Sequence, residues 1–315
     1  MRVPRRTNFL WGVVLLALAI ILFLHALGLI PVGIMDLINR SWPVLLVFAG
    51  LSIVLRDRVR FGSLLALLLS AGLVFVLVTS AFSSRIGQQR EDYRLTVTET
   101  VSPQVNLLRV SLRTLATNVE IVRSLDSRAI AGEFVGSTES VLQTEYTESG
   151  ENTADLTITE QQPNQFPLLE AVGRGRFRLE LPAGLPLDVS FIGADGTLTL
   201  NMSDLSLERL NVDLASGSAV ITLPEYQPLG SSGDALLGTF VARSGSLTVR
   251  VPSAVAARFQ LNRGGGGFEP VYDSLVYNYL VGDILEARNF DGAPIQIRYG
   301  ITVPRGVITV ESTAS

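Results

Sequence analysis

Side chains that most often carry chemistry are scarce in this sequence. It holds one histidine, no cysteine and no lysine, so its 25 basic residues are all arginine. Without cysteine there is no thiolate nucleophile and no disulfide, and without lysine there is no Schiff base and no phosphate-loop motif. The histidine, His25, lies inside a long apolar segment. A proton-relay role and a neutral, hydrogen-bonded role are both open for it.

The other candidate motifs have ordinary structural explanations. Asp195-Gly196 and Asp291-Gly292 are typical turn dipeptides, and Gly264–Gly267 is better interpreted as a flexible turn than as a phosphate cradle. The acidic half of the chain contains no histidine that could serve as a base for its glycine-flanking serines, Ser216, Ser218, Ser244 and Ser246. We therefore predict no catalytic, cofactor-binding or metal-binding residue, and no enzyme.

Long apolar segments dominate residues 1–84. Residues 8–30 and 61–82 contain no charged side chain, and a bilayer core of about 30 Å needs about 20 residues of helix. Residues 42–55 are equally apolar but shorter, about 21 Å as a helix. We predict an α-helical transmembrane block whose partner is the lipid bilayer. Its first segment is longer than a signal-peptide core, so we expect a retained anchor.

The middle apolar segment, residues 42–55, decides the topology. If it spans the bilayer there are three spans and residues 85–315 lie outside; if it only dips in, they stay inside. The positive-inside rule does not separate these arrangements, because each puts six arginines on cytoplasmic flanks and four on outer flanks. We favour three spans, because so long an apolar run is costly to leave in water. This predicts a multi-pass protein of the cell membrane with an extracytoplasmic C-terminal part.

Charge separates the two parts of the chain. Residues 1–84 hold seven Arg and two Asp, a net +5, whereas residues 85–315 hold 18 Arg and 27 acidic residues, a net −9; together they give −4. A nucleic-acid partner would need a basic patch facing its phosphates. The acidic balance argues against such a partner.

The hydrophobic period changes to two after a polar juxtamembrane linker over residues 85–94. Alternation predicts strands at the start of the segment that follows, and Val141–Ser149 with Thr153–Glu160 predicts a hairpin across Gly150-Glu151-Asn152. No amphipathic helix longer than two turns is evident. Residues 95–315 are therefore predicted to form a mainly-β domain.

A repeat runs through residues 175–252. A glycine is followed by apolar residues at plus four and plus six, and usually by proline at plus seven. The copies start at Gly175, Gly196, Gly217 and Gly245, which are 21, 21 and 28 residues apart. This spacing is typical of one strand-plus-turn unit per coil, and it predicts repeated short strands in a solenoid- or roll-like fold. Apolar side chains should stack between coils, among them Leu198, Leu200, Leu205, Leu207, Leu210, Val212 and Leu214.

Two stretches carry a resemblance to a known family. The membrane block, with Trp42-Pro43 followed by LLVFAGL and Gly50, resembles that of LiaF- and LiaI-type envelope-stress proteins. Residues 191–224 (FIGADGTLTLNMSDLSLERLNVDLASGSAVITLP) and 243–252 (RSGSLTVRVP) resemble the toast-rack β domain that follows it and that accompanies PspC-type regulators. The sequence departs from the pattern after Gly264, where it becomes Gly-rich and then Tyr-rich.

The resemblance implies a non-enzymatic sensor or regulator of cell-envelope stress that acts by protein–protein contact through its β domain. A sensor kinase or another envelope-stress membrane protein would be its partner, and a homo-oligomer stays open. Two alternatives remain beside it. One is a structural or adhesive surface-display module with no signalling role. The other is a carboxylate-based hydrolase of wall glycans.

Overall fold

The computed structural model describes residues 46–47, 68–69, 71–73, 75–76, 78–81, 85, 88–150, 152–162, 173–229, 235–263 and 269–313. The chain divides into two compact units. One holds Met1–Gln88 with Gln162–Gly173, and the other holds Gln89–Gln161 with Arg174–Ser315.

The described residues between 46 and 85 of the first unit are helical. Between residues 68 and 81 the hydroxyl of Thr79 donates to the carbonyl oxygens of Phe75 and Val76, at 2.8 and 3.1 Å, a bond that threonine often makes within a helix. Among the described residues, no helix is long and apolar enough to cross a membrane. The predicted segment 8–30, His25 within it, and most of 42–55 lie outside these residues.

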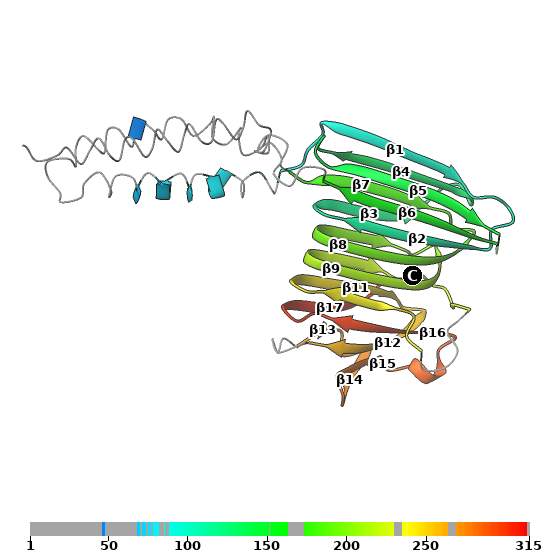
Figure 1. Ribbon diagram of the computed structural model, residues 1–315. Helices are drawn as coiled ribbons and strands as arrows, with labels where there is room; N and C mark the ends of the chain where they lie inside the picture. Colours follow the sequence, from blue (N-terminus) through cyan, green and yellow to red (C-terminus); the bar gives the residue numbers. More distant parts are fainter. Residues whose placement is uncertain are drawn as a thin grey trace, which may run out of the picture. The chain divides into compact units, whose positions relative to one another are not determined.

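The second unit is built of β-strands stacked as rungs (Figure 1). Its described elements, in chain order, are β1 (Tyr93–Thr100), β2 (Leu107–Thr114), β3 (Thr117–Arg123), β4 (Ala129–Gly136), β5 (Val141–Ser149), β6 (Thr153–Gln161), β7 (Gly175–Leu181), β8 (Pro186–Asn201), β9 (Ser206–Thr222), β10 (Thr239–Ala242), β11 (Gly245–Pro252), β12 (Val255–Asn262), β13 (Val271–Tyr272), β14 (Tyr277–Leu280), β15 (Ile284–Ala287), the 3-10 helix η2 (Phe290–Gly292), β16 (Ile295–Thr302) and β17 (Gly306–Thr313). The predicted mainly-β domain is therefore confirmed.

The strands pair in two rows. One row runs β5-β6-β2-β8-β9-β10-β16-β12-β15-β14, and the other runs β1-β4-β7-β3-β8-β9-β11-β17-β13. The middle pairs of both rows are parallel. The strands β8 and β9 belong to both rows, because each is long enough, at 16 and 17 residues, to bend from one row into the other. The chain thus winds as stacked coils, with antiparallel pairs near each end of the stack.

A glycine ladder marks the corner where coils cross between rows. Gly196, Gly217, Gly245 and Gly306 are register partners of one another in sequence along the stack. Gly217 and Gly245 have φ of +117° and +134°, and an added Cβ would lie only 1.9 and 1.7 Å from the carbonyl oxygen of the preceding rung. Only glycine fits such close backbone approach. The ladder explains the glycine at the start of the last three copies of the repeat. The first copy departs from the prediction, because Gly175 pairs with Thr117 and β3 lies between β7 and β8.

The core lies between the two rows. The side chains predicted to stack are buried, from Leu198 and Leu200 on β8 to Leu210, Val212 and Leu214 on β9, and so are the residues at plus four and plus six of each repeat. Alternation along each strand sends the intervening side chains outward. Burial of apolar area at about 25 cal/mol per Å² is the main term that holds such a stack together.

A buried carboxylate completes the corner between β2 and β3. Glu160, at the end of β6, accepts hydrogen bonds from the backbone N–H of Leu115 at 2.6 Å, from the N–H of Ala116 and from the hydroxyl of Ser140. These bonds offset the cost of burying the carboxylate.

Two local predictions can be compared directly with the strands. The predicted hairpin is confirmed, because β5 and β6 pair antiparallel over their full lengths. The turn predicted at Asp195-Gly196 is wrong: both residues lie within β8, at the bend that carries the glycine ladder. Asp291-Gly292 closes η2, and Gly264–Gly267 lies outside the described residues. Tyr93 and Arg94, placed in the linker by the sequence pattern, begin β1.

Candidate functional site

The serines considered as nucleophiles take part in the pairing of neighbouring strands. Ser218 and Ser246 are register partners on β9 and β11, and the carbonyl oxygen of Ser244 accepts the N–H of Gly217 at 3.0 Å. Within the part of the chain that the structure describes, no group of three His, Cys, Asp or Glu side chains could hold a metal ion. Among the described residues, these serines lie on and beside the paired strands of the stack.

A regular surface lies on the outward side of β8, β9, β11 and β17. Its side chains form rows across the parallel strands: Thr197 is the register partner of Ser218, and Thr248 is the partner of both Val220 and Thr309. We call this surface the hydroxyl face and define it as Thr197, Thr199, Ser218, Val220, Thr222, Ser246, Thr248, Val307 and Thr309. These side chains are half-buried or exposed, small and uncharged. They offer a protein partner a ribbed surface with a low side-chain entropy cost on binding.

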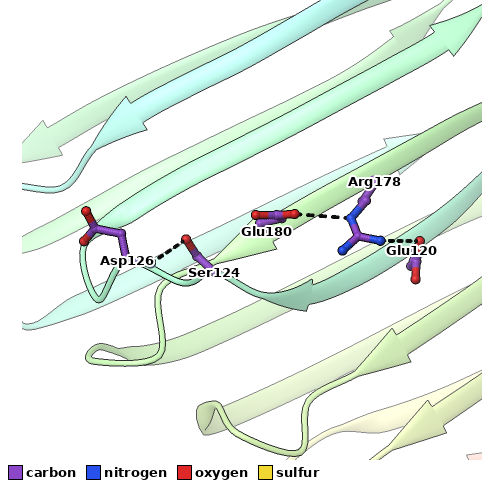
Figure 2. Close-up of polar contacts among 5 residues, drawn as sticks. All are labelled: Glu120, Ser124, Asp126, Arg178 and Glu180. Atoms are coloured by element: carbon purple, nitrogen blue, oxygen red, sulfur yellow. Dashed lines mark hydrogen bonds and ion pairs between the residues drawn. The ribbon is translucent and has the colours of Figure 1, made fainter.

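Ion pairs border the hydroxyl face on two sides. On one border the Arg178 guanidinium on β7 lies between Glu180, at 3.2 Å, and Glu120 on β3, at 3.4 Å (Figure 2). On the other border Arg250 of β11 pairs with Glu311 of β17 at 3.0 Å. These side chains are a third or more exposed, so each pair contributes little to stability. Their effect is to frame the neutral face with charge of both signs, which can orient a partner.

Figure 2 also shows how the loop after β3 is held. The hydroxyl of Ser124 accepts the backbone N–H of Asp126 at 3.3 Å, a short local bond typical of a turn. Next to Arg178, a hollow of about 250 Å³ opens over β1, β4 and β7, lined by Thr96, Val97, Thr98, Ala131, Gly132, Glu133, Arg178 and Glu180. It is smaller than most ligand sites.

A larger cleft opens on the side of the stack where strands end in turns. We call it the turn-side cleft; its volume is about 580 Å³, and its lining is Arg123, Ala183, Ser203, Asp204, Leu205, Ser206, Glu225, Tyr226, Pro252 and Thr313. The repeat places it there, because the proline or serine after each copy ends a strand and starts a turn. Volumes of 300–1,000 Å³ are usual for small-molecule sites.

One wall of the turn-side cleft is Tyr226, whose hydroxyl is held by a hydrogen bond. The Tyr226 hydroxyl donates to one oxygen of the Glu208 carboxylate at 2.6 Å, and the N–H of Leu229 donates to the other at 2.9 Å. Burial of the phenol, followed by its bond to Glu208, raises the pKa of Tyr226 to about 12. The phenol is therefore neutral near pH 7, and its hydrogen bond to Glu208 fixes its orientation.

Sequence reasoning missed the residues of this cleft and one rung of the ladder. Tyr226 and Glu225 follow the repeat proline Pro224 directly, so their place beside the turns could have been inferred from the repeat. Gly306 and Val310 match the glycine-plus-four spacing of the repeat. Because no proline follows them, the sequence pattern did not identify this stretch as a further copy. Contacts between residues distant in sequence, such as Arg123 with Asp204, gave no local signal.

One solved structure shows a fold similar to that of the β domain. A candidate cell adhesion protein from Clostridium sporogenes matches 70% of this chain and 100% of its own, with a TM-score of 0.55 and 14% identity, which supports a shared fold alone. A candidate adhesin from Bacteroides fragilis matches 72% of this chain and 100% of its own at 12% identity, but its TM-score of 0.22 is too low to support a statement about fold.

The sequence comparisons concern the N-terminal part. No curated protein matches the chain significantly. Residues 10–88 match the family described as the LiaF transmembrane domain, which implies membrane anchoring and confirms the resemblance noted at Trp42-Pro43. The chain thus joins a membrane segment similar to the LiaF transmembrane domain to a toast-rack-like β domain whose fold is similar to that of an adhesion-type protein.

Proposed function

We propose that this chain is a non-enzymatic, membrane-anchored regulator of the cell-envelope stress response, acting by protein–protein contact through its β domain. The observation that carries the proposal is the match of residues 10–88 to the LiaF transmembrane domain. Three spans would place the β domain outside the cytoplasmic membrane. There the β domain, a solenoid of the toast-rack type, would contact a sensor kinase or another envelope-stress membrane protein.

The hydroxyl face is the surface that best suits such a partner. It is uncharged along its centre and bordered by the Glu120–Arg178–Glu180 cluster and the Arg250–Glu311 pair. Parallel strands hold its rows in register, so the face is already ordered before binding. A preorganised surface gains affinity because little freedom is lost on association.

Deletion and complementation in the source bacterium test this function. Deletion should change the output of an envelope-stress reporter during treatment with a wall-active antibiotic, and the full chain should restore it. The Ser246→Arg variant, which puts a bulky charge on the hydroxyl face, should fail to restore the output. Thr157→Arg on β6 is the matched control, because Thr157 is an exposed threonine of the other row.

The alternative of an adhesive surface module is favoured by one observation, the fold likeness to a candidate cell adhesion protein. In that case deletion would leave the stress reporter unchanged and reduce attachment of cells to a surface or to one another. This outcome would overturn the regulatory proposal.

A further inference from the structure

The turn-side cleft offers a second kind of binding, independent of the proposed contact through the hydroxyl face. Its lining comes from the ends of successive coils: Arg123 ends β3, Ser203 to Ser206 join β8 to β9, and Pro252 is the last residue of β11. A site assembled from rigidly stacked turns is largely preformed.

Three kinds of group meet in this cleft. Tyr226 supplies an aromatic ring held by Glu208, and the partly exposed Ala183 supplies a small apolar surface, while Leu205 and Pro252 are buried members of the wall. Asp204 and Glu225 are exposed carboxylates in its lining.

The charged groups of the cleft remain accessible. The Arg123 guanidinium lies 3.6 Å from the Asp204 carboxylate, longer than a good charge-assisted hydrogen bond, and the two side chains are 52% and 66% exposed. An exposed pair of this length contributes little by itself, so its donors and acceptors can turn to a ligand at low cost.

Backbone pairing favours a sugar over an extended peptide as the ligand. Where they approach the cleft, β3, β8, β9 and β11 are each paired on both sides, so these strands present no free edge for an extended peptide. Recognition by these four strands must come from their side chains. Carboxylates, a guanidinium, hydroxyls and one aromatic face suit a ligand with many hydroxyl groups and an apolar ring face.

We infer that the turn-side cleft binds a short oligosaccharide, with one sugar ring against Tyr226 and its hydroxyl groups bonded to Asp204, Glu225 and Arg123. Binding is non-covalent and involves no reaction.

The experiment uses the full chain in lipid nanodiscs and a panel of three soluble probes, tri-N-acetylchitotriose, cellotriose and maltotriose. Saturation-transfer NMR detects binding, and titration calorimetry gives the dissociation constant. We expect at least one trisaccharide to bind. Tyr226→Ala should weaken that binding about tenfold, Tyr226→Phe should leave it within about twofold, and Asp204→Asn and Glu225→Gln should each weaken it about fivefold.

A matched control comes from another tyrosine–glutamate pair in the same domain. The Tyr146 hydroxyl donates to Glu148 at 2.6 Å, away from the cleft lining, so Tyr146→Ala should leave the affinity unchanged. Thermal unfolding of every variant shows whether it is folded. If Tyr226→Ala is unfolded, the two carboxylate variants decide.

Three results would overturn the inference: no probe binds, binding survives the Tyr226, Asp204 and Glu225 substitutions, or the cleft binds trilysine in place of the sugars. None of them would affect the regulatory proposal, which is tested at Ser246. Failure of that test would likewise leave the sugar inference standing.

Discussion

The backbone of Gly217 has a φ of +117°, and an added Cβ would stand 1.9 Å from the carbonyl oxygen of Gly196. Gly217→Ala must therefore push two rungs apart, and we expect it to lower the free energy of unfolding by about 3 kcal/mol or more. Thermal and urea unfolding followed by circular dichroism measure the change. Gly292→Ala is the control, because nothing lies within 4 Å of its Cβ position. Equal stability of the two variants would contradict the glycine-ladder account.

Residue identity alone predicted part of this chemistry. The absence of lysine and cysteine excluded thiolate, Schiff-base and phosphate-loop chemistry. The glycine spacing predicted that Gly196, Gly217 and Gly245 hold equivalent positions in successive coils, and the structure places them at one corner of the stack. The sequence misled at Asp195-Gly196, because a dipeptide that favours turns also fits a bend inside a long strand when backbones approach closely. The repeat could place Tyr226 and Glu225 beside the turns, but the turn-side cleft as a whole could not be predicted, since its members come together only after the coils stack.

Hydrogen bonds to Glu148 hold the end of β5 to the loop after β1. The pKa of Glu148 is lowered by the hydroxyl of Tyr146 and by the N–H and hydroxyl of Ser102, all of which donate to the charged carboxylate. A group with a lowered folded pKa stabilises above its unfolded pKa and loses that effect as pH falls through the folded value.

We therefore expect Glu148→Gln to lower the melting temperature at pH 7 and to have a smaller effect at pH 2.5, where more of the wild-type carboxylate is protonated. Differential scanning calorimetry of both proteins at the two pH values measures this. Glu145→Gln, on an exposed residue of the same strand, is the control. A difference that stays constant between pH 7 and pH 2.5 would show that the carboxylate charge is not involved.

The elements were predicted unevenly for a physical reason. Alternation with period two located the β5–β6 hairpin, because local pattern and turn residues specify it together. It did not show that β8 and β9 run 16 and 17 residues across two rows, since a bent strand alternates as two short strands do. Pairing of β10 with both β9 and β16 spans long stretches of chain and leaves no local pattern.

The side of the membrane that holds the β domain is the property of the whole molecule that most affects its function. With three spans, a C-terminal tag should be removed by protease in intact cells stripped of their wall, while a cytosolic control stays whole. Protection of the tag until the membrane is permeabilised would refute three spans and move the search for partners to the cytoplasm.

The glycine ladder also limits how the domain can change its length. Residues 196 and 217 are register partners, so one coil of the repeat takes 21 residues. A duplication or deletion of one such unit would join matching corners and preserve the core. A one-residue shift within a strand would turn its apolar side chains outward, whereas the turns accept other lengths, as the 28 residues from Gly217 to Gly245 show. Each unit adds one strand spacing, about 4.8 Å, to the stack. In evolution the height of the stack can therefore change only by whole rungs, in steps of one strand spacing.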